Sequence, residues 1–192
     1  MRDLFGAPDT HNPGGKALPL PAGVMASAIY GGPGDCYRYR LDWTWNPALP
    51  RMAAGMMNPS CAGHLCGDNT VAWVHRWSSL RGFGALTVFN ASAYRCTNQA
   101  RLAEVADPTG PDNARHILEA ARGAALIVLG YGSPKVAAVR DHGPRMTGLL
   151  HKAEVKLHVW RMGKKAPWHP LYLPGDIEAV PWHPVNALRR GR

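Results

Sequence analysis

Short runs of apolar and β-branched residues alternate along this chain with segments that have helical signals. The clearest run covers residues 124–130, and residues 51–57 and 85–89 have the same character. Such runs are typical of buried strands. Strands that alternate with helices favour a parallel sheet covered by helices on both faces. We therefore predict an α/β fold, a three-layer sandwich around a central, mostly parallel sheet of four or five strands.

The remaining segments extend this pattern. Aromatic and polar residues alternate over 37–45 and apolar and polar residues over 155–160, which predicts two more strands. Helices are predicted over residues 70–80, 114–122, 133–140 and 145–153. Residues 1–27 are rich in Gly and Pro and are predicted to form a flexible arm. Residues 28–192 have the length of one domain and are predicted to fold as one.

The charge of the chain indicates a polyanionic partner. Lys and Arg number 22 against 13 Asp and Glu, which gives a net charge of +9. Such an excess on one small domain favours nucleic acid, and DNA is the partner we expect. No apolar run has the length of a membrane span, and the first residues lack the apolar core of a signal peptide. We expect a cytoplasmic monomer without a membrane partner.

Polar residues follow several of the predicted strands directly. Asn58 comes after the run over 51–57, Asn90 ends the run over 85–89, and His169 follows the last strand. The carboxyl ends of parallel strands lie at one edge of a sheet, so we expect these side chains around one crevice. Lys164 and Lys165 precede His169 in a basic loop and are candidates for contacts with phosphates.

Five motifs relate the chain to a known family: YRYRL at 37–41, MNPS at 57–60, FNASAYR at 89–95, DPTGPDN at 107–113 and HPLYL at 169–173. On these motifs, residues 28–173 resemble a family of short bacterial and phage proteins known mainly as a domain of unknown function. The resemblance covers most of the chain in long, ordered motifs. It says nothing by itself about chemistry.

A more distant resemblance concerns the uracil-DNA glycosylase superfamily. GMMNPS at 55–60 is similar to the Gly-Ile-Asn-Pro-Gly motif of its mismatch-specific branch, and TVFNASAYR at 87–95 is similar to the strand and loop that read the flipped base. ALIVLG at 125–130 and HPL at 169–171 are similar to its next strand and to its His-Pro-Ser-Pro motif. The resemblance implies a glycosylase-like fold and a reaction at the bond between base and sugar.

The same resemblance implies roles for individual residues. Asn58 would position the attacking water and His169 would stabilise the departing base, which makes these two the expected catalytic residues. The base would be bound by Met57, Asn90 and Tyr172. DNA would be contacted by Ser60, Ser133 and Leu171, with Lys164 and Lys165 beside them. No cofactor and no metal is expected.

The function implied is that of a monofunctional DNA glycosylase that leaves an abasic site. The acid and the Tyr that make the uracil-specific branch selective have no counterpart in residues 57–60. We therefore expect a C5-modified pyrimidine as the substrate, in defence against phages with modified DNA such as glucosylated hydroxymethylcytosine. The alternative is a non-catalytic nucleic-acid or nucleotide-binding module. A nucleoside-cleaving enzyme is disfavoured, because a nucleoside lacks the phosphate that the positive charge would attract.

Several residues have a structural interpretation beside the functional one. Asp68 is predicted to cap the helix over 70–80, with the ordering of water as the alternative. Arg38 and Arg40 are interpreted as solvated charges on a strand. A metal site is weighed against free thiols, which we favour, for the cysteines near the proposed site: Cys61, Cys66 and Cys96.

Overall fold

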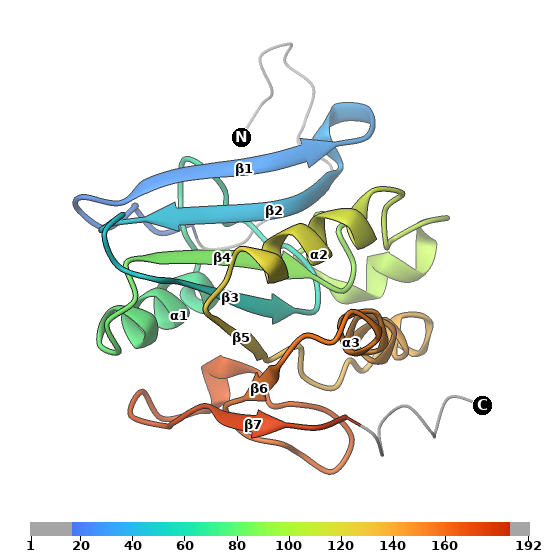
Figure 1. Ribbon diagram of the computed structural model, residues 1–192. Helices are drawn as coiled ribbons and strands as arrows, with labels where there is room; N and C mark the ends of the chain where they lie inside the picture. The colour runs from blue at the N-terminus through green and yellow to red at the C-terminus, as the bar shows by residue number, and fades with distance from the viewer. Residues whose placement is uncertain (1–16, 185–192) are drawn as a thin grey trace.

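A computed structural model describes residues 17–184 of the chain, and one sheet of seven strands runs through them (Figure 1). Its strands lie in the order β1-β2-β4-β3-β5-β6-β7. Their bounds are β1 (Met25–Gly31), β2 (Tyr37–Thr44), β3 (Arg51–Met56), β4 (Ala85–Asn90), β5 (Leu126–Leu129), β6 (Leu157–Val159) and β7 (Val180–Trp182). The central strands β4, β3, β5 and β6 are parallel, and β1, β2 and β7 pair antiparallel at the two edges.

Three helices connect the parallel strands, and the order of those strands decides which face each helix covers. Helix α1 (Asn69–Ser79) leads from β3 to β4, and α2 (Asn113–Arg122) leads from β4 back past β3 to β5. Since such crossovers are right-handed, helices that lead in opposite directions along the sheet lie on opposite faces. Helix α3 (His142–Lys152) connects β5 to β6 in the same direction as α2.

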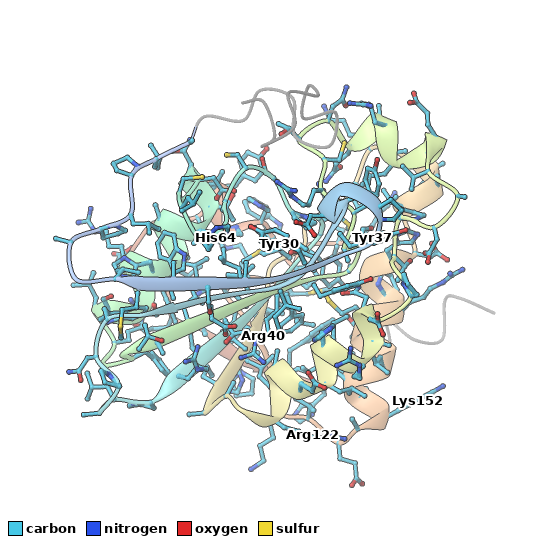
Figure 2. All side chains as sticks on the ribbon, turned by 90° about the horizontal axis from the view of Figure 1, so that it is seen from above. Tyr30, Tyr37, Arg40, His64, Arg122 and Lys152 are labelled. Atoms are coloured by element: carbon cyan, nitrogen blue, oxygen red, sulfur yellow. The ribbon has the colours of Figure 1, made fainter. Side chains whose placement is uncertain are left out.

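The core confirms this arrangement in two separate apolar clusters. On one face, Val74 and Trp77 of α1 pack with Met52 of β3 and Leu86 of β4. On the other face, α2 and α3 bury a second set against β4 and β5: Phe89, Ile117, Ala121, Leu129, Met146 and Leu150. The ends of α2 and α3, marked by Arg122 and Lys152, lie on this second side (Figure 2). The chain therefore has a sheet between two helical layers.

Most of the predicted elements are present, but the sheet is larger than the four or five strands predicted. Strand β1 was missed because its sequence, MASAIYG, is dominated by small residues, and its exposed positions alternate with half-buried positions that carry mainly alanine and not large apolar side chains. Strand β7 contains Pro181, which is tolerated because β7 is an edge strand that pairs only with β6. The parallel strands alone number four.

Two further predictions require correction. A helix was predicted over 133–140, but only a 3-10 turn, Ala137–Val139, forms there, because the loop after β5 bends at Gly132 and residues 133–136 continue without helical structure along the cavity described below. The arm predicted over 1–27 overlaps β1, and Leu18 already pairs with Gly67 through two backbone hydrogen bonds of 2.9 and 2.8 Å. The rest of that arm, residues 1–16, lies outside the described residues. Within residues 17–184, no helix combines the length and the apolar character needed to cross a membrane.

The central strand β5 supplies a test of this packing. Leu129 is fully buried at its carboxyl end, between the sheet and the helices α2 and α3. Leu129→Ala should lower the free energy of unfolding by about 2–5 kcal/mol, because it removes buried methyl groups and leaves a cavity. Leu80→Ala, at an exposed leucine after α1, should change it by less than about 0.5 kcal/mol. Urea unfolding of both variants measures the difference, and equal losses would contradict the assignment of the core.

Candidate functional site

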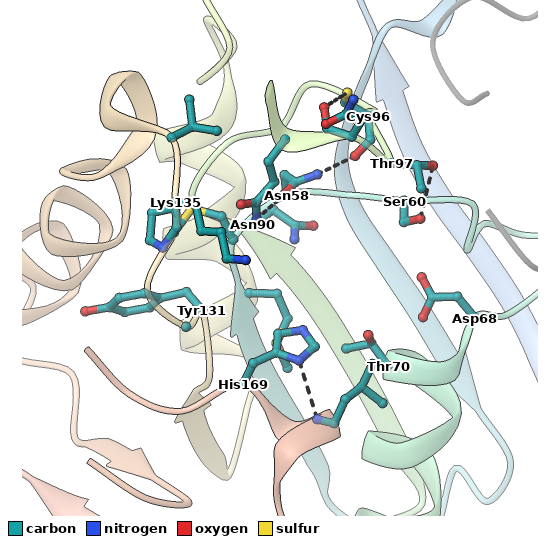
Figure 3. A pocket seen from close by; sticks show the side chains of 18 of the residues that line it. Asn58, Ser60, Asp68, Thr70, Asn90, Cys96, Thr97, Tyr131, Lys135 and His169 are labelled. Atoms are coloured by element: carbon teal, nitrogen blue, oxygen red, sulfur yellow. Dashed lines mark hydrogen bonds between the residues drawn. The ribbon is translucent and has the colours of Figure 1, made fainter. Parts of the chain in front are cut away.

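A cavity of about 590 Å³ lies at the edge of the sheet where β3, β4 and β5 end (Figure 3). The parallel register brings these ends together, since Met56 of β3 pairs with Asn90 of β4, and Gly55 pairs with Leu129 of β5. Residues that follow each strand form the walls. The segment from His169 to Tyr172 closes another side, and a hydrogen bond of 3.0 Å from Gly132 N to Pro167 O joins it to the loop after β5.

This cavity contains eight of the ten residues selected from the sequence. The residues that line it are Met57, Asn58, Ser60, Asn90, Ser133, His169, Leu171 and Tyr172. Lys164 and Lys165 do not line it; they are exposed in the loop between Met162 and Pro167, which are paired as a bridge. The sequence reasoning did not select Lys135 or Gln99, which also line the cavity. A lysine in an irregular loop and a glutamine in a 3-10 turn have no sequence signal that distinguishes them.

Asn58 is held by the loop that follows β4. Its Nδ2 donates to the backbone oxygen of Cys96 and, over 3.2 Å, to that of Pro59. Its Oδ1 accepts a hydrogen bond of 3.1 Å from Gln99 Nε2. A carbonyl oxygen has two acceptor positions, so Oδ1 retains one for a molecule in the cavity. Asn58 therefore presents an oriented acceptor.

Asn90 is buried at the end of β4 and is oriented by a cation. Arg38 Nη2 donates to Asn90 Oδ1 over 3.0 Å, and the backbone oxygen of Asn90 accepts 2.9 Å from Asn113 Nδ2. A guanidinium has donors only, so Oδ1 faces Arg38 and the Nδ2 donor faces the other way. Arg38 itself is only 2% exposed, which corrects its interpretation as a solvated charge. Burial lowers the pKa of Arg38, which nevertheless remains a cation at neutral pH.

His169 points into the cavity from the side opposite the two asparagines (Figure 3). It caps the 3-10 turn Pro170–Tyr172, where its Nδ1 accepts from the backbone N–H of Leu171 over 3.4 Å. In a neutral imidazole this places the proton on Nε2, as a donor. Burial lowers the pKa of His169, which favours this neutral form. Gly132, at φ +69°, lets the loop after β5 pass close to the Cβ of His169.

The charge of the lining is uneven. Among the described residues that line the cavity, Asp68 is the sole carboxylate, and Arg38 and Lys135 are the arginine and lysine cations. The predicted helix cap is confirmed, because Asp68 Oδ1 accepts from Val71 N over 2.9 Å. The same carboxylate borders the cavity, so capping and contact with a bound molecule are compatible.

The apolar residues after His169 differ in exposure. Leu171 is 46% and Tyr172 77% exposed, so both are available at the rim of the cavity. Leu173, the next residue, is buried in the core with α1 and does not line the cavity.

The cysteines near the cavity make contacts of their own. Cys66 Sγ donates to Cys61 O over 3.2 Å, and Cys96 Sγ donates to Asn98 O over 2.8 Å. The four cysteines of the chain all lie within the described residues, and none of them forms a disulfide. Among residues 17–184, no three His, Cys, Asp or Glu side chains are grouped as metal ligands would be.

Comparison with known proteins identifies the family. The model of the family described as "Protein of unknown function (DUF1643)" matches residues 38–171, which include the cavity residues from Arg38 to Leu171. The chain belongs to this family. No curated protein and no solved structure matches the chain. The function of this DUF1643 chain must therefore be argued from its site.

Three histidines of this DUF1643 chain provide a test of its electrostatics. Burial lowers the pKa of His75, His142 and His169 from the ordinary value of 6.5. The unfolded chain therefore binds protons at a pH where the folded chain does not. The contribution of the three histidines to the free energy of unfolding is therefore complete above pH 6.5. It is lost as the pH falls below 6.5 toward their lower pKa values in the folded chain. We expect a lower urea midpoint at pH 6.0 than at pH 7.5, and uptake of protons on unfolding at pH 6.0. A midpoint that is constant or rises on acidification would contradict these shifts.

Proposed function

We propose that the chain is a DNA glycosylase that hydrolyses the N-glycosidic bond of a flipped, C5-modified pyrimidine and leaves an abasic site. The observation that carries the proposal is the meeting of Asn58, Asn90 and His169 in one cavity. These residues come from three separate segments of the chain, after β3, at the end of β4 and after β6. The proposal includes a uracil-DNA glycosylase-like fold, to which the parallel sheet between helices corresponds at a coarse level.

The arrangement suits the demands of this reaction. When the bond breaks, positive charge develops on the sugar and negative charge on the base. The Nε2–H of His169 is a donor for that negative charge, and a pre-organised donor acts selectively on the transition state. The free acceptor position of Asn58 Oδ1 can hold a water, and positioning alone lowers the barrier to attack on the sugar. Asn90 offers a donor to the edge of the base.

Other features support DNA as the polymer. The net charge of +9 favours a polyanion, and Lys135 at the cavity can meet a phosphate of the strand. Leu171 and Tyr172 at the rim are apolar surfaces that can fill the space left by a flipped base. We further propose that the enzyme acts as a cytoplasmic monomer against phage genomes with modified bases, such as glucosylated hydroxymethylcytosine.

The direct test is incubation of the full chain with matched DNA duplexes that contain cytosine, uracil, thymine, hydroxymethylcytosine or its glucosylated form. Released base is identified by mass spectrometry, and abasic sites are detected as alkali-labile breaks. Release of the modified pyrimidine with little release of cytosine or thymine is the expected result. DNA binding without any released base would contradict the glycosylase proposal and favour the alternative, a non-catalytic nucleic-acid-binding module.

Asn58→Ala should slow single-turnover base release by about a hundredfold or more, because the loss falls on the reacting water. DNA affinity should stay close to that of the wild type, since the amide acts after the base has entered the cavity. Asn46→Ala is the matched control, because Asn46 is exposed and lies far from the cavity. Its backbone N–H donates to Gly84 O at the opposite end of the sheet. Wild-type turnover by Asn58→Ala would remove Asn58 from the mechanism.

The salt dependence of DNA binding tests the charges. The logarithm of the binding constant should fall by about 0.9 per phosphate contacted for each tenfold rise in salt. Lys135→Ala should flatten this slope by about one unit, and the double variant Lys164→Ala, Lys165→Ala by about one to two. Lys152→Ala, on the exposed end of α3, should leave the slope unchanged (Figure 2). A flat response in the wild type would exclude DNA as the partner.

A further inference from the structure

Arg38 is a buried cation without a buried anion. It is 2% exposed, and among residues 17–184 no Asp or Glu lies within ion-pair distance of its guanidinium. Nη1 donates to Ala62 O and Nη2 to Asn90 Oδ1, while the buried Nε has no acceptor. A buried charge is normally paired, because removal from water is costly. The unpaired guanidinium therefore requires an explanation other than the stability of the fold.

The position of Arg38 suggests that explanation. Its side chain lines the cavity, and it holds Asn90 so that the amide donor faces away from the guanidinium. The cation and the amide donor thus form one electropositive surface at the end of β4. Asp68, the carboxylate of the lining, attracts the guanidinium from a distance and offsets part of its charge, but it forms no ion pair with Arg38, and its Oδ1 accepts the cap hydrogen bond of α1. His169 contributes a neutral donor from the opposite side.

We infer that Arg38 and Asn90 form a receptor for a planar anionic heterocycle, namely a pyrimidine base that carries negative charge on its ring. The inference rests on the proposed function, in which the bond between C1′ and the base nitrogen breaks and leaves its electron pair on the base. The water oxygen bonds C1′ and releases one proton to solvent, and the base anion takes a proton from solvent after it leaves. Arg38 acts through Asn90 as a positioning residue whose charge favours the anion over the neutral base.

Free bases test this inference without any need for catalysis. 5-Nitrouracil is an anion at neutral pH because the nitro group acidifies the ring, whereas thymine, of similar size, is neutral. At pH 7.5 the wild-type chain should bind 5-nitrouracil at least about tenfold more tightly than thymine, as measured by calorimetry. Arg38→Gln should lose this preference, and Arg38→Lys, which retains the charge, should keep most of it.

Two controls separate charge recognition from folding. Arg40→Gln changes a neighbouring arginine of β2 that pairs with Asp42 and does not line the cavity, and it should keep the preference. Arg38→Met removes the charge with a side chain of similar length, and melting temperatures show whether each variant is folded. Loss of the preference in a folded Arg38→Gln or Arg38→Met variant supports the inference.

The outcomes also separate this inference from the proposed function. Equal affinity of the wild type for the two bases, or an unchanged preference in Arg38→Gln, would overturn the role of Arg38 even where base release from DNA is observed. If the preference for 5-nitrouracil depends on Arg38 but no base is released from any DNA, the anion receptor is supported and the glycosylase proposal is wrong. Where release occurs, the rate loss in Arg38→Gln should be larger for the less acidic leaving base, because that base needs more stabilisation.

Discussion

The parallel pairing of β3 with β4 and β5 is the constraint on which the rest of the structure depends. It aligns Met56 with Asn90, and the pairing continues beyond the strands through hydrogen bonds from Ala91 N to Met56 O and from Ser92 N to Met57 O, of 2.9 and 2.8 Å. Successive side chains of a strand point to opposite faces of the sheet. A slip of one residue in β4 would therefore turn Asn90 away from Arg38 and place an apolar side chain at the cavity.

The sequence was sufficient for the parts of this fold that rest on local patterns. The apolar run of β5 and the Asp68 cap of α1 have signals within a few residues, and both elements form where they were predicted. The edge strands β1 and β7 depend instead on pairing with β2 and β6, which a local pattern does not reveal. The helix predicted over 133–140 failed because the loop after β5 must bend at Gly132 to contact the His169 segment.

The residues of the candidate site also divide into those with a local sequence signal and those that only the assembled fold reveals. Asn58, Asn90 and His169 were selected because polar residues that follow parallel strands gather at one edge. Arg38 was not selected, since an alternating strand predicts a solvated side for its charged residues. Near its start, however, β2 is covered on both sides: Tyr39 stacks on His116 of α2, and Arg38 bonds the loop that contains Ala62. Burial on both sides is a property of the assembled fold, so no sequence pattern within β2 shows it.

The two asparagines of the cavity are the same residue type with opposite tasks, and their partners decide the difference. Gln99 donates to Asn58 Oδ1 and the backbone of Cys96 accepts from its Nδ2, which leaves an acceptor position of Asn58 for a bound molecule. Arg38 donates to the Oδ1 of Asn90, which leaves the Nδ2 of Asn90 as a donor for a bound molecule. An acceptor suits a water that must lose a proton, and a donor suits a base that gains negative charge. The division of labour that the proposed reaction needs thus lies in the groups behind the two amides, the backbone of Cys96 for Asn58 and the guanidinium of Arg38 for Asn90.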